Sequence, residues 1–251
     1  MELIPAIDLR DGKVVRLLRG DYGKETVYSS DPVAVARQFE AAGVARLHVI
    51  DLDGALAGSP GNALVCQRIA QAVRIPIQVG GGLRTMGVVE QVMAMGAERV
   101  ILGTSAVSDP ELVGKVVAKY GAQRVVVGLD ARDGMVAVKG WTEDTPLSAR
   151  ELMAAMAVAC VGRFIFTDIA RDGTLTEPNF DAVASLVHHG HGLVVSGGWQ
   201  GGPALIATGG IGTIEHLERL ADIGVEGAIV GSALYTGGID LGRAVRTLEG
   251  S

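Results

Sequence analysis

The amino-acid sequence predicts a (β/α)8 barrel, a TIM barrel built from two duplicated half-barrels. Three observations support this prediction. Short β-branched runs alternate with helical patterns from end to end, eight strand–helix units fit into 251 residues, and motifs of the first half recur in the second. A doubly wound open sheet is the alternative, but it would normally show a glycine fingerprint after its first strand. Here Asp8 follows the first strand instead.

The predicted strands are short and largely apolar, as expected of strands that are covered on both faces. They are Leu3–Ile7, Arg46–Asp51, Ile75–Val79, Arg99–Leu102, Val125–Leu129, Arg163–Thr167, Leu205–Thr208 and Gly227–Val230. Helices are predicted between them. An Asp-Pro pair favours a helix start because Asp caps the first turn and Pro fits its first position, and glycine favours an end. The clearest helices run from Asp31-Pro32 to Gly43, from Asp109-Pro110 to Gly121 and from Glu215 to Gly224.

The internal repeat indicates four strand–helix units in each half. Val79-Gly-Gly-Gly-Leu-Arg-Thr recurs as Ala207-Thr-Gly-Gly-Ile-Gly-Thr, and Ile101-Leu-Gly-Thr-Ser-Ala recurs as Ile229-Val-Gly-Ser-Ala-Leu. The apolar run that ends at Asp8 recurs before Asp130, and an Asp-Gly turn follows each aspartate. Such a repeat places corresponding residues of the two halves on opposite sides of one barrel.

A change in the repeat spacing predicts an insertion in the second half. Asp51 and Asp168 are 117 residues apart, whereas Gly82 and Gly210 are 128 apart. We therefore expect one barrel domain over 1–251 with an insertion near 192–202. That segment contains Leu193–Ser196, an alternative seventh strand. We prefer Leu205–Thr208, which keeps the spacing of the following repeat, and expect the inserted copy to be a loop on the face away from the chemistry.

Composition narrows the class of protein. The formal charge is −6 with no basic block, so we expect no nucleic-acid partner. The two cysteines, Cys66 and Cys160, are scattered, which indicates a reducing compartment and no metal cluster. The sequence shows no N-terminal signal and no stretch long enough to span a bilayer. We expect a cytoplasmic monomer that acts on a small molecule and does not bind membranes.

Asp8 and Asp130 are the candidate catalytic residues. They end the first and fifth predicted strands, and functional groups of this fold lie at the carboxyl ends of strands. Because these strands are opposite one another in an eight-stranded barrel, the two carboxyl groups would face each other across its axis. Two carboxyl groups around a small substrate suggest an acid–base pair. Capping of turns is the alternative role for each.

Paired glycine motifs predict two phosphate sites. Glycine lets backbone N–H groups approach an anion closely, and a neighbouring hydroxyl adds a donor. The repeat relates the two sites, and the strand 7/8 position is a recurrent phosphate site of this fold. Tight turns in short loops are the alternative explanation. The residues are Gly81, Gly82, Gly103 and Thr104 at the first site, and Gly209, Gly210, Gly231 and Ser232 at the second.

Four further residues are candidates for substrate binding. Arg16 lies in a predicted hairpin-like loop over the mouth and could clamp a phosphate. Trp141, in a glycine-flanked loop, could stack on a base ring or simply pack. Thr167 ends the sixth strand and could hydrogen-bond the reacting group. Asp172, in an Asp-Gly turn, suits a turn role and a ligand role equally well.

Three histidines near the insertion do not indicate a metal site. His188, His189 and His191 lie at a predicted helix end with no carboxylate cluster near them in the sequence, and basic residues there suit the helix dipole. We expect no metal. The sequence also shows no nucleophile elbow and no dinucleotide fingerprint.

Five motifs together resemble the family of histidine-biosynthesis isomerases that act on phosphoribosylformimino-5-aminoimidazole carboxamide ribotide (ProFAR). The resemblance runs from Glu2 to about Arg246. It implies an Amadori rearrangement of an aminoaldose to an aminoketose, a substrate with two phosphates, and no metal or organic cofactor. It also implies Asp8 as general base and Asp130 as general acid. The motifs begin at Ile4 (Ile-Pro-Ala-Ile-Asp-Leu), Gln78 (Gln-Val-Gly-Gly-Gly-Leu-Arg-Thr), Gly128 (Gly-Leu-Asp), Thr167 (Thr-Asp-Ile-Ala-Arg-Asp-Gly-Thr) and Gly227 (Gly-Ala-Ile-Val-Gly-Ser-Ala-Leu-Tyr).

Three alternatives remain beside that family. The related cyclase subunit of imidazole glycerol phosphate synthase usually has Cys where this chain has Ala6. Isomerases that also act on phosphoribosylanthranilate tend to carry Ser where this chain has Gly80. A non-catalytic phosphate binder is the third alternative, but retention of both aspartates argues against it. The segment around Trp199 departs from the family pattern and puts the Gly209-Gly210 site in doubt.

Overall fold

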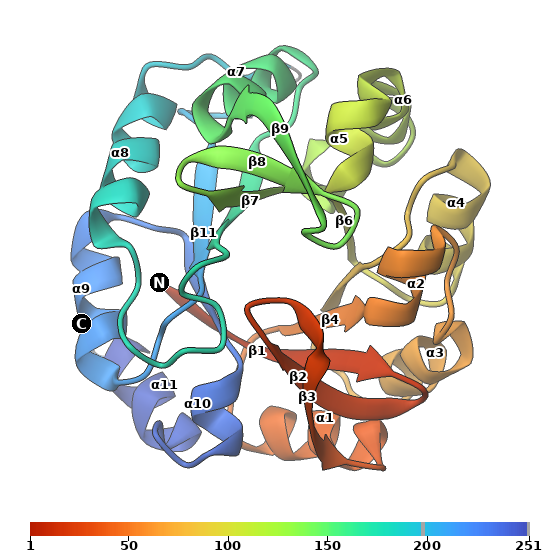
Figure 1. Ribbon diagram of the computed structural model, residues 1–251, viewed down its shortest axis with the longest axis vertical. Coiled ribbons are helices and arrows are strands. Elements are labelled where there is room, and N and C mark those ends of the chain that lie inside the picture. The colour runs from red at the N-terminus through yellow and green to blue at the C-terminus, as the bar shows by residue number, and fades with distance from the viewer. Residues whose placement is uncertain (197–198, 250–251) are drawn as a thin grey trace.

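The computed structural model, which describes residues 1–196 and 199–249, is a closed barrel of eight parallel strands with helices around it (Figure 1). The strands pair in the order β10-β11-β12-β1-β4-β5-β6-β7, and pairing of β7 with β10 closes the ring. The prediction of a (β/α)8 barrel is therefore confirmed. The barrel strands are β1 (Glu2–Arg10), β4 (Leu47–Asp51), β5 (Ile77–Gly80), β6 (Arg99–Leu102), β7 (Val125–Arg132), β10 (Arg163–Asp168), β11 (Ala204–Thr208) and β12 (Gly227–Val230).

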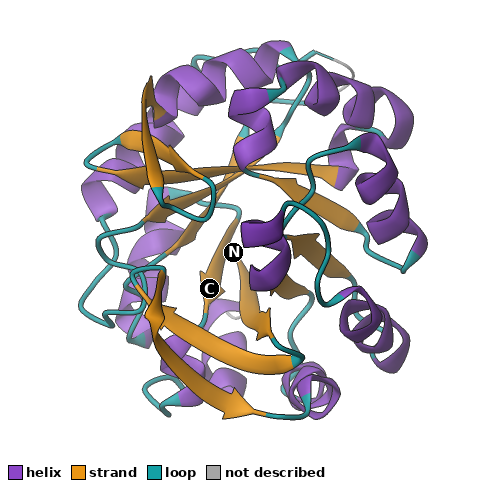
Figure 2. Cartoon of the chain, turned by 45° about the vertical axis from the view of Figure 1, so that its right-hand side comes forward, coloured by secondary structure: helices purple, strands orange, loops and turns teal. Residues whose placement is uncertain are grey.

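The helices lie on the outside of the barrel (Figure 2). They are α1 (Pro32–Ala41), α2 (Leu52–Ala57), α3 (Ala63–Ala72), α4 (Met86–Ala94), α5 (Thr104–Ser108), α6 (Pro110–Tyr120), α7 (Ala149–Val158), α8 (Phe180–His191), α9 (Ile214–Ile223), α10 (Ser232–Tyr235) and α11 (Leu241–Glu249). The side chains of Asp31 and Asp109 cap α1 and α6, and Gly224 ends α9 in the left-handed conformation, as predicted. Over the described ranges, no helix has the length and apolar character needed to cross a membrane.

Each half-barrel carries an extra hairpin at the same place. Strands β2 (Lys13–Leu18) and β3 (Asp21–Ser29) follow β1, and strands β8 (Met135–Val138) and β9 (Glu143–Ser148) follow β7. The turn after β1 has φ values of 47° at Asp11 and 73° at Gly12, and the turn after β7 has 51° at Asp133 and 82° at Gly134. Two successive positive φ values explain the repeated Asp-Gly pair, which two-residue hairpin turns favour.

Two hydrophobic clusters hold the layers together. The larger lies between the sheet and the helices and includes Val35, Leu47, Val100, Leu152 and Leu217, all nearly inaccessible to solvent. The smaller fills the inside of the barrel. It consists of Ile4, Ala6, Ile101, Val126, Ile165, Ile206 and Ile229, with Ile50 packed against it. The inner cluster closes the barrel axis below the carboxyl ends of the strands, so a ligand can enter only above it.

The seventh strand is the second of its two candidates. β11 pairs with β10 and β12, whereas Leu193–Ser196 forms no strand. In the inserted segment, Trp199 stacks on the Arg163 guanidinium with 5.0 Å between the guanidinium carbon and the ring centroid. Arg163 begins β10, so the described part of the insertion lies at the amino end of the barrel, away from the carboxyl-end loops, as predicted. Residues 197–198 of the insertion lie outside the described residues.

We expect Trp199→Ala to lower stability without lowering turnover. The ring covers a bidentate ion pair, because Arg163 Nε and Nη2 bond the two carboxylate oxygens of Glu226. Loss of the cation–π contact and its shielding should cost on the order of 1–2 kcal/mol of unfolding free energy. Urea unfolding measures that loss, and kcat of the folded variant should equal that of the wild type. A large fall in kcat would place the insertion in the catalytic machinery.

Candidate active site

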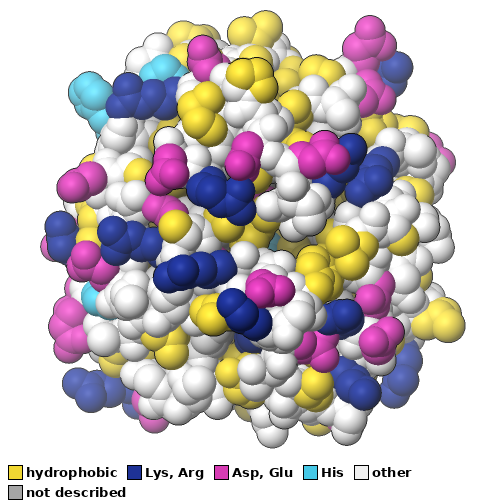
Figure 3. Space-filling view, in the orientation of Figure 1, with side chains coloured by type: hydrophobic (Ala, Val, Ile, Leu, Met, Phe, Trp, Pro, Cys, Tyr) yellow, Lys and Arg dark blue, Asp and Glu magenta, His cyan; other side chains and the backbone are white. Residues whose placement is uncertain are grey.

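Two adjoining cavities open at the carboxyl ends of the barrel strands, and they share Arg16 and Asp172 in their walls. Figure 3 shows the hollow at the centre of this face, with hydrophobic side chains in it and charged side chains of both signs around it. All fourteen candidate residues line these cavities. They are Asp8, Arg16, Gly81, Gly82, Gly103, Thr104, Asp130, Trp141, Thr167 and Asp172 in the larger, and Gly209, Gly210, Gly231 and Ser232 in the smaller.

Asp8 lies near the end of β1, where the strand leaves the barrel to pair with β2. Its Oδ2 accepts a hydrogen bond from Arg16 Nη1 at 2.7 Å, and both side chains are largely buried. Burial raises the pKa of Asp8 to about 6, against the opposing effect of Arg16. A carboxyl group with this pKa is ionised at neutral pH yet still basic enough to take a proton.

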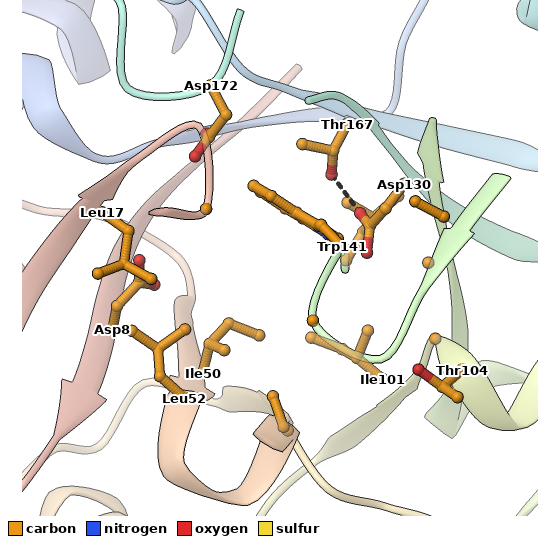
Figure 4. A pocket seen from close by; sticks show the side chains of 18 of the residues that line it. Asp8, Leu17, Ile50, Leu52, Ile101, Thr104, Asp130, Trp141, Thr167 and Asp172 are labelled. Atoms are coloured by element: carbon orange, nitrogen blue, oxygen red, sulfur yellow. Dashed lines mark hydrogen bonds between the residues drawn. The ribbon is translucent and has the colours of Figure 1, made fainter. Parts of the chain in front are cut away.

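Asp130 lies on β7 across the cavity from Asp8 (Figure 4). Its Oδ1 accepts a hydrogen bond from Thr167 Oγ1 at 2.6 Å, and Thr167 is its register partner on β10. Burial raises the pKa of Asp130, while hydrogen bonds from Thr167 and Trp141 act to lower it. The two aspartates therefore share one cavity but differ in their partners, since only Asp8 has an arginine.

Arg16 connects three parts of the site. Besides its bond to Asp8, its Nη2 lies 3.7 Å from Asp172 Oδ1. Its guanidinium also lies against Gly231, where a Cβ atom would collide with it. Burial raises the pKa of Asp172, opposed chiefly by Arg16. Asp172 is thus a third buried carboxyl group in the cavity. The sequence alone suits a turn role and a ligand role equally well.

The first glycine pair adopts backbone conformations that glycine favours. Gly81 and Gly82 follow β5 with φ values of 105° and 75°, which strongly disfavour other residues. Gly103 begins α5 with φ −100° and ψ −92°, and nothing lies within 4 Å of the place where its Cβ would be. Thr104 Oγ1 accepts a bond from the backbone N–H of Lys139 at 2.9 Å. The open space beside Gly103 faces the cavity.

The second glycine pair repeats this backbone closely. Gly209 and Gly210 have φ values of 91° and 76°, and Gly231 begins α10 with φ −115° and ψ −96°. The segment before β11 therefore does not change this backbone geometry. The close packing of Gly210 against the Glu177 carbonyl also supports the alternative explanation, because these turns need glycine even without a ligand. An arginine lies near each pair: the Arg16 guanidinium lies against Gly231 at the second site, and Arg84, in the motif of the first pair, lines the larger cavity.

Trp141 lies at the tip of the β8–β9 hairpin with φ 69° and reaches into the cavity (Figure 4). Its ring packs on Gly20, in the turn of the β2–β3 hairpin, where a Cβ atom would collide with it. The Trp141 side chain also acts to lower the pKa of Asp130. Trp141 therefore both packs and lines the site, and the two hairpins meet above the cavity.

The lining residues that were not among the sequence candidates include His48, Arg84 and Tyr22. His48 is two residues before Ile50 on the same strand, so strand alternation could have placed it inside. Arg84 belongs to the repeated glycine motif and donates from Nη2 to the Ala55 carbonyl at 2.8 Å. No sequence pattern indicated that Tyr22 would line the cavity, because its position depends on the fold of the β2–β3 hairpin.

Two further strand-end aspartates are structural. Asp51 accepts hydrogen bonds from Asn62 Nδ2 at 2.7 Å and from the backbone N–H of Gly54 and Gly61. Asp168 accepts from Asn179 Nδ2 at 2.7 Å, at the matching place in the second half. These pairs fix the loops that follow β4 and β10.

The three clustered histidines lie in the last turn of α8. Across residues 1–196 and 199–249, no three His, Cys, Asp or Glu side chains gather in a way that could hold a metal ion.

Comparison with known proteins gives a consistent match over the whole chain. The model of the family described as "Histidine biosynthesis protein" matches residues 2–240. A relative from Herpetosiphon aurantiacus is 51% identical over 249 residues, with 99% of both chains covered. One from Chloroflexus aggregans is 49% identical, covering 98% of this chain and 97% of the relative, and one from Synechocystis is 46% identical, covering 99% and 93%. All three are named 1-(5-phosphoribosyl)-5-((5-phosphoribosylamino)methylideneamino)imidazole-4-carboxamide isomerase.

Proposed function

The chain belongs to the histidine biosynthesis protein family and is an isomerase of that pathway, and we propose that Asp8 and Asp130 are its general base and general acid. The proposed reaction is an aldose–ketose isomerisation, and the relatives are named as isomerases of the corresponding imidazole-4-carboxamide. The observation that supports the proposal most is the placement of the two carboxyl groups on opposite sides of one buried cavity. Their different partners favour different protonation states, as acid–base pairs require.

The proposed reaction begins at Asp130. In its protonated form Asp130 donates a proton to the ring oxygen of the aminoaldose ribose, and the ring opens to a Schiff base at C1. Asp8, held ionised by Arg16, then removes the proton from C2. The electron pair of that C–H bond forms the C1–C2 double bond of an enolamine, while the C=N electron pair moves to the nitrogen. The enolamine then gains a proton at C1 and loses the proton of its C2 hydroxyl, which gives the aminoketose. Trp141 and Thr167 are positioned to hold Asp130 toward the substrate during the first step.

The two glycine pairs are the proposed sites for the two phosphates of the substrate. They lie on opposite sides of the cavity and share one backbone geometry, so both ends of a long substrate would be fixed with its sugar between the aspartates. Fixing both ends lowers the entropy cost of reaching the reactive geometry. Arg16 would add a charged contact to the phosphate at the Gly231 site.

We expect Ser232→Asp to raise KM by about tenfold or more. Two negative charges 4 Å apart repel by about 4 kcal/mol at an effective dielectric constant of 20. Steady-state kinetics with the bisphosphate substrate measures the effect, and kcat should change much less than KM. Ser196→Asp is the matched control, because the same charge is then added in the exposed insertion. Equal KM values in the two variants would remove Ser232 from the phosphate site.

Packing at Gly80 supports the single-substrate isomerase over the dual-specificity alternative. A Cβ atom at Gly80 would lie 2.9 Å from the Ile50 Cδ1 atom and 3.1 Å from the Ile101 Cβ atom. The serine that the dual-specificity relatives tend to carry would therefore require the cavity wall to shift. The cytoplasmic location, the monomeric state and the absence of a cofactor stay predictions from the sequence.

A further inference from the structure

A row of three polar side chains runs through the apolar interior of the barrel. His48 on β4, Gln78 on β5 and Arg99 on β6 are register partners, with exposed fractions of 8%, 0% and 8%. Partners on neighbouring strands point to the same face of a sheet, so the three lie side by side. Barrel strands are tilted, and the row therefore rises from Arg99, near Glu2 at the amino end, to His48 in the cavity wall.

The second half-barrel has apolar residues in the same row. Ile165 on β10, Ile206 on β11 and Gly227 on β12 are partners in the matching register, and the isoleucines belong to the inner cluster. The two half-barrels share one backbone arrangement, so the barrel can also close with apolar side chains at these positions. Burying polar groups costs free energy unless they are hydrogen-bonded. The polar row is thus not needed for closure, which suggests that it serves the cavity.

The contacts of Gln78 give its side-chain amide one orientation. The Nε2 group donates to His48 Nδ1 at 2.9 Å. On the other side, Gln78 Oε1 and the Nε and Nη1 atoms of Arg99 are buried without hydrogen-bond partners in the described residues. An acceptor and a cation on neighbouring strands attract one another, so the amide oxygen stays toward Arg99 and the amide nitrogen toward His48. A ring nitrogen that accepts a hydrogen bond carries no proton, and the proton of the neutral imidazole is then on Nε2.

We propose that Gln78 is a positioning residue, which holds His48 as a neutral imidazole whose Nε2–H donates a hydrogen bond to the sugar in the cavity. The inference rests on the proposed function, because it requires a sugar between the two aspartates. His48 lines the cavity, and none of the described residues bonds its Nε2. Burial, with a smaller contribution from Arg16, lowers the pKa of His48 to about 3. His48 therefore offers a proton for hydrogen bonding without adding a second cation beside Arg16.

The protonation of His48 can be read directly without substrate. In ring-15N-labelled wild-type protein, with the His48 signals assigned from a His48→Asn variant, we expect a protonated Nε2 and an unprotonated Nδ1. In Gln78→Glu the carboxylate can only accept, so the proton should move to Nδ1, and the new charge should be tolerated because it faces Arg99. A protonated Nδ1 in the wild type would overturn the proposal, as would an unprotonated Nδ1 in Gln78→Glu.

Kinetics then tests the consequence for the reaction. We expect Gln78→Met and Gln78→Glu each to lower kcat by about tenfold or more, a typical effect of losing a group that orients a functional histidine, with KM changed far less. Ile206→Met is the matched control, because it places the same side chain at the same position of the other half-barrel. It should keep kcat within about twofold. Equal losses in Gln78→Met and Ile206→Met would reduce Gln78 to a packing residue.

The two proposals fail in different ways. If the wild type does not turn over the bisphosphate substrate, the proposed function fails, while the nitrogen spectra still decide how Gln78 orients His48. If turnover is normal but the Gln78 variants keep the wild-type kcat, the proposed function stands and the positioning role is refuted.

Discussion

Asp8→Asn should lower kcat by at least a hundredfold, because the amide cannot take the proton from C2. General acid–base groups typically contribute about 10²–10⁴-fold. In the wild type, kcat/KM should increase as pH rises through about 6, where Asp8 ionises. The fold should survive the substitution, since Asn keeps the shape of Asp and Arg16 retains Asp172 as a partner. Loss of turnover in a folded variant would then mean that the proton transfer is lost and the fold is not.

Stability provides a second measurement of the same group. The folded-state pKa of Asp8 is raised from 3.8 to about 6. Its contribution to the free energy of unfolding is therefore most favourable below pH 4 and is lost as pH rises through 6. Asp8→Asn removes this dependence. We therefore expect the variant to gain stability relative to the wild type as pH rises from 4 to 7. Urea unfolding at several pH values measures the difference in unfolding free energy between the variant and the wild type. A difference that does not change with pH would contradict the raised pKa.

Asp11→Asn is the matched control for Asp8. Asp11 is three residues further on, exposed in the β1–β2 turn with φ 47°, a conformation that Asn tolerates well. Its turnover should equal that of the wild type. Near-normal kcat in Asp8→Asn as well would eliminate the assignment of Asp8 as the base.

Asp130→Asn should also lower kcat by at least a hundredfold, but through a different step. The amide cannot protonate the ring oxygen, so ring opening becomes rate-limiting. Substrate deuterated at C2 distinguishes the two variants. In Asp130→Asn the isotope effect on kcat should disappear, because the C2–H bond breaks after the slow step, whereas in Asp8→Asn it should persist.

Asp133→Asn is the control for Asp130. Asp133 is exposed in the β7–β8 turn with φ 51°, and its substitution should leave turnover unchanged. A loss below tenfold in Asp130→Asn, with the isotope effect retained, would refute its role as the acid. Asp172 would then be the remaining buried carboxyl group in the cavity, and Asp172→Asn would test it.

The seventh strand shows where sequence reasoning needed the repeat. Leu193–Ser196 and Leu205–Thr208 have similar patterns, and local propensity does not separate them. The spacing between corresponding glycines in the two halves favoured the second, and β11 confirms it. The repeat spacing was sufficient to identify the seventh strand, because the number of units in a closed barrel fixes the neighbours of each strand.

Less of the site than of the fold could be predicted from the sequence. Strand ends, glycine pairs and three loop residues gave fourteen candidates that all line the two cavities, since in this fold the carboxyl ends of all strands and the loops after them meet at one face. The same reasoning could not separate Asp8 from Asp51, because both end an apolar strand. Their roles differ through partners distant in the sequence: Asn62 bonds Asp51 within a loop network, whereas Arg16 holds Asp8 at the cavity.

By itself, the sequence determined the barrel, its duplication and the two glycine motifs, because these follow from periodicity, spacing and local backbone requirements, and the resemblance of five motifs indicated the family. Only the tertiary structure decided which buried groups touch: Arg16 between Asp8 and Asp172, Trp141 on Gly20, and Gln78 between His48 and Arg99. The physical reason is that burial and charge pairing set protonation. Both depend on the distances between side chains that barrel closure brings together, and no spacing along the chain encodes those distances.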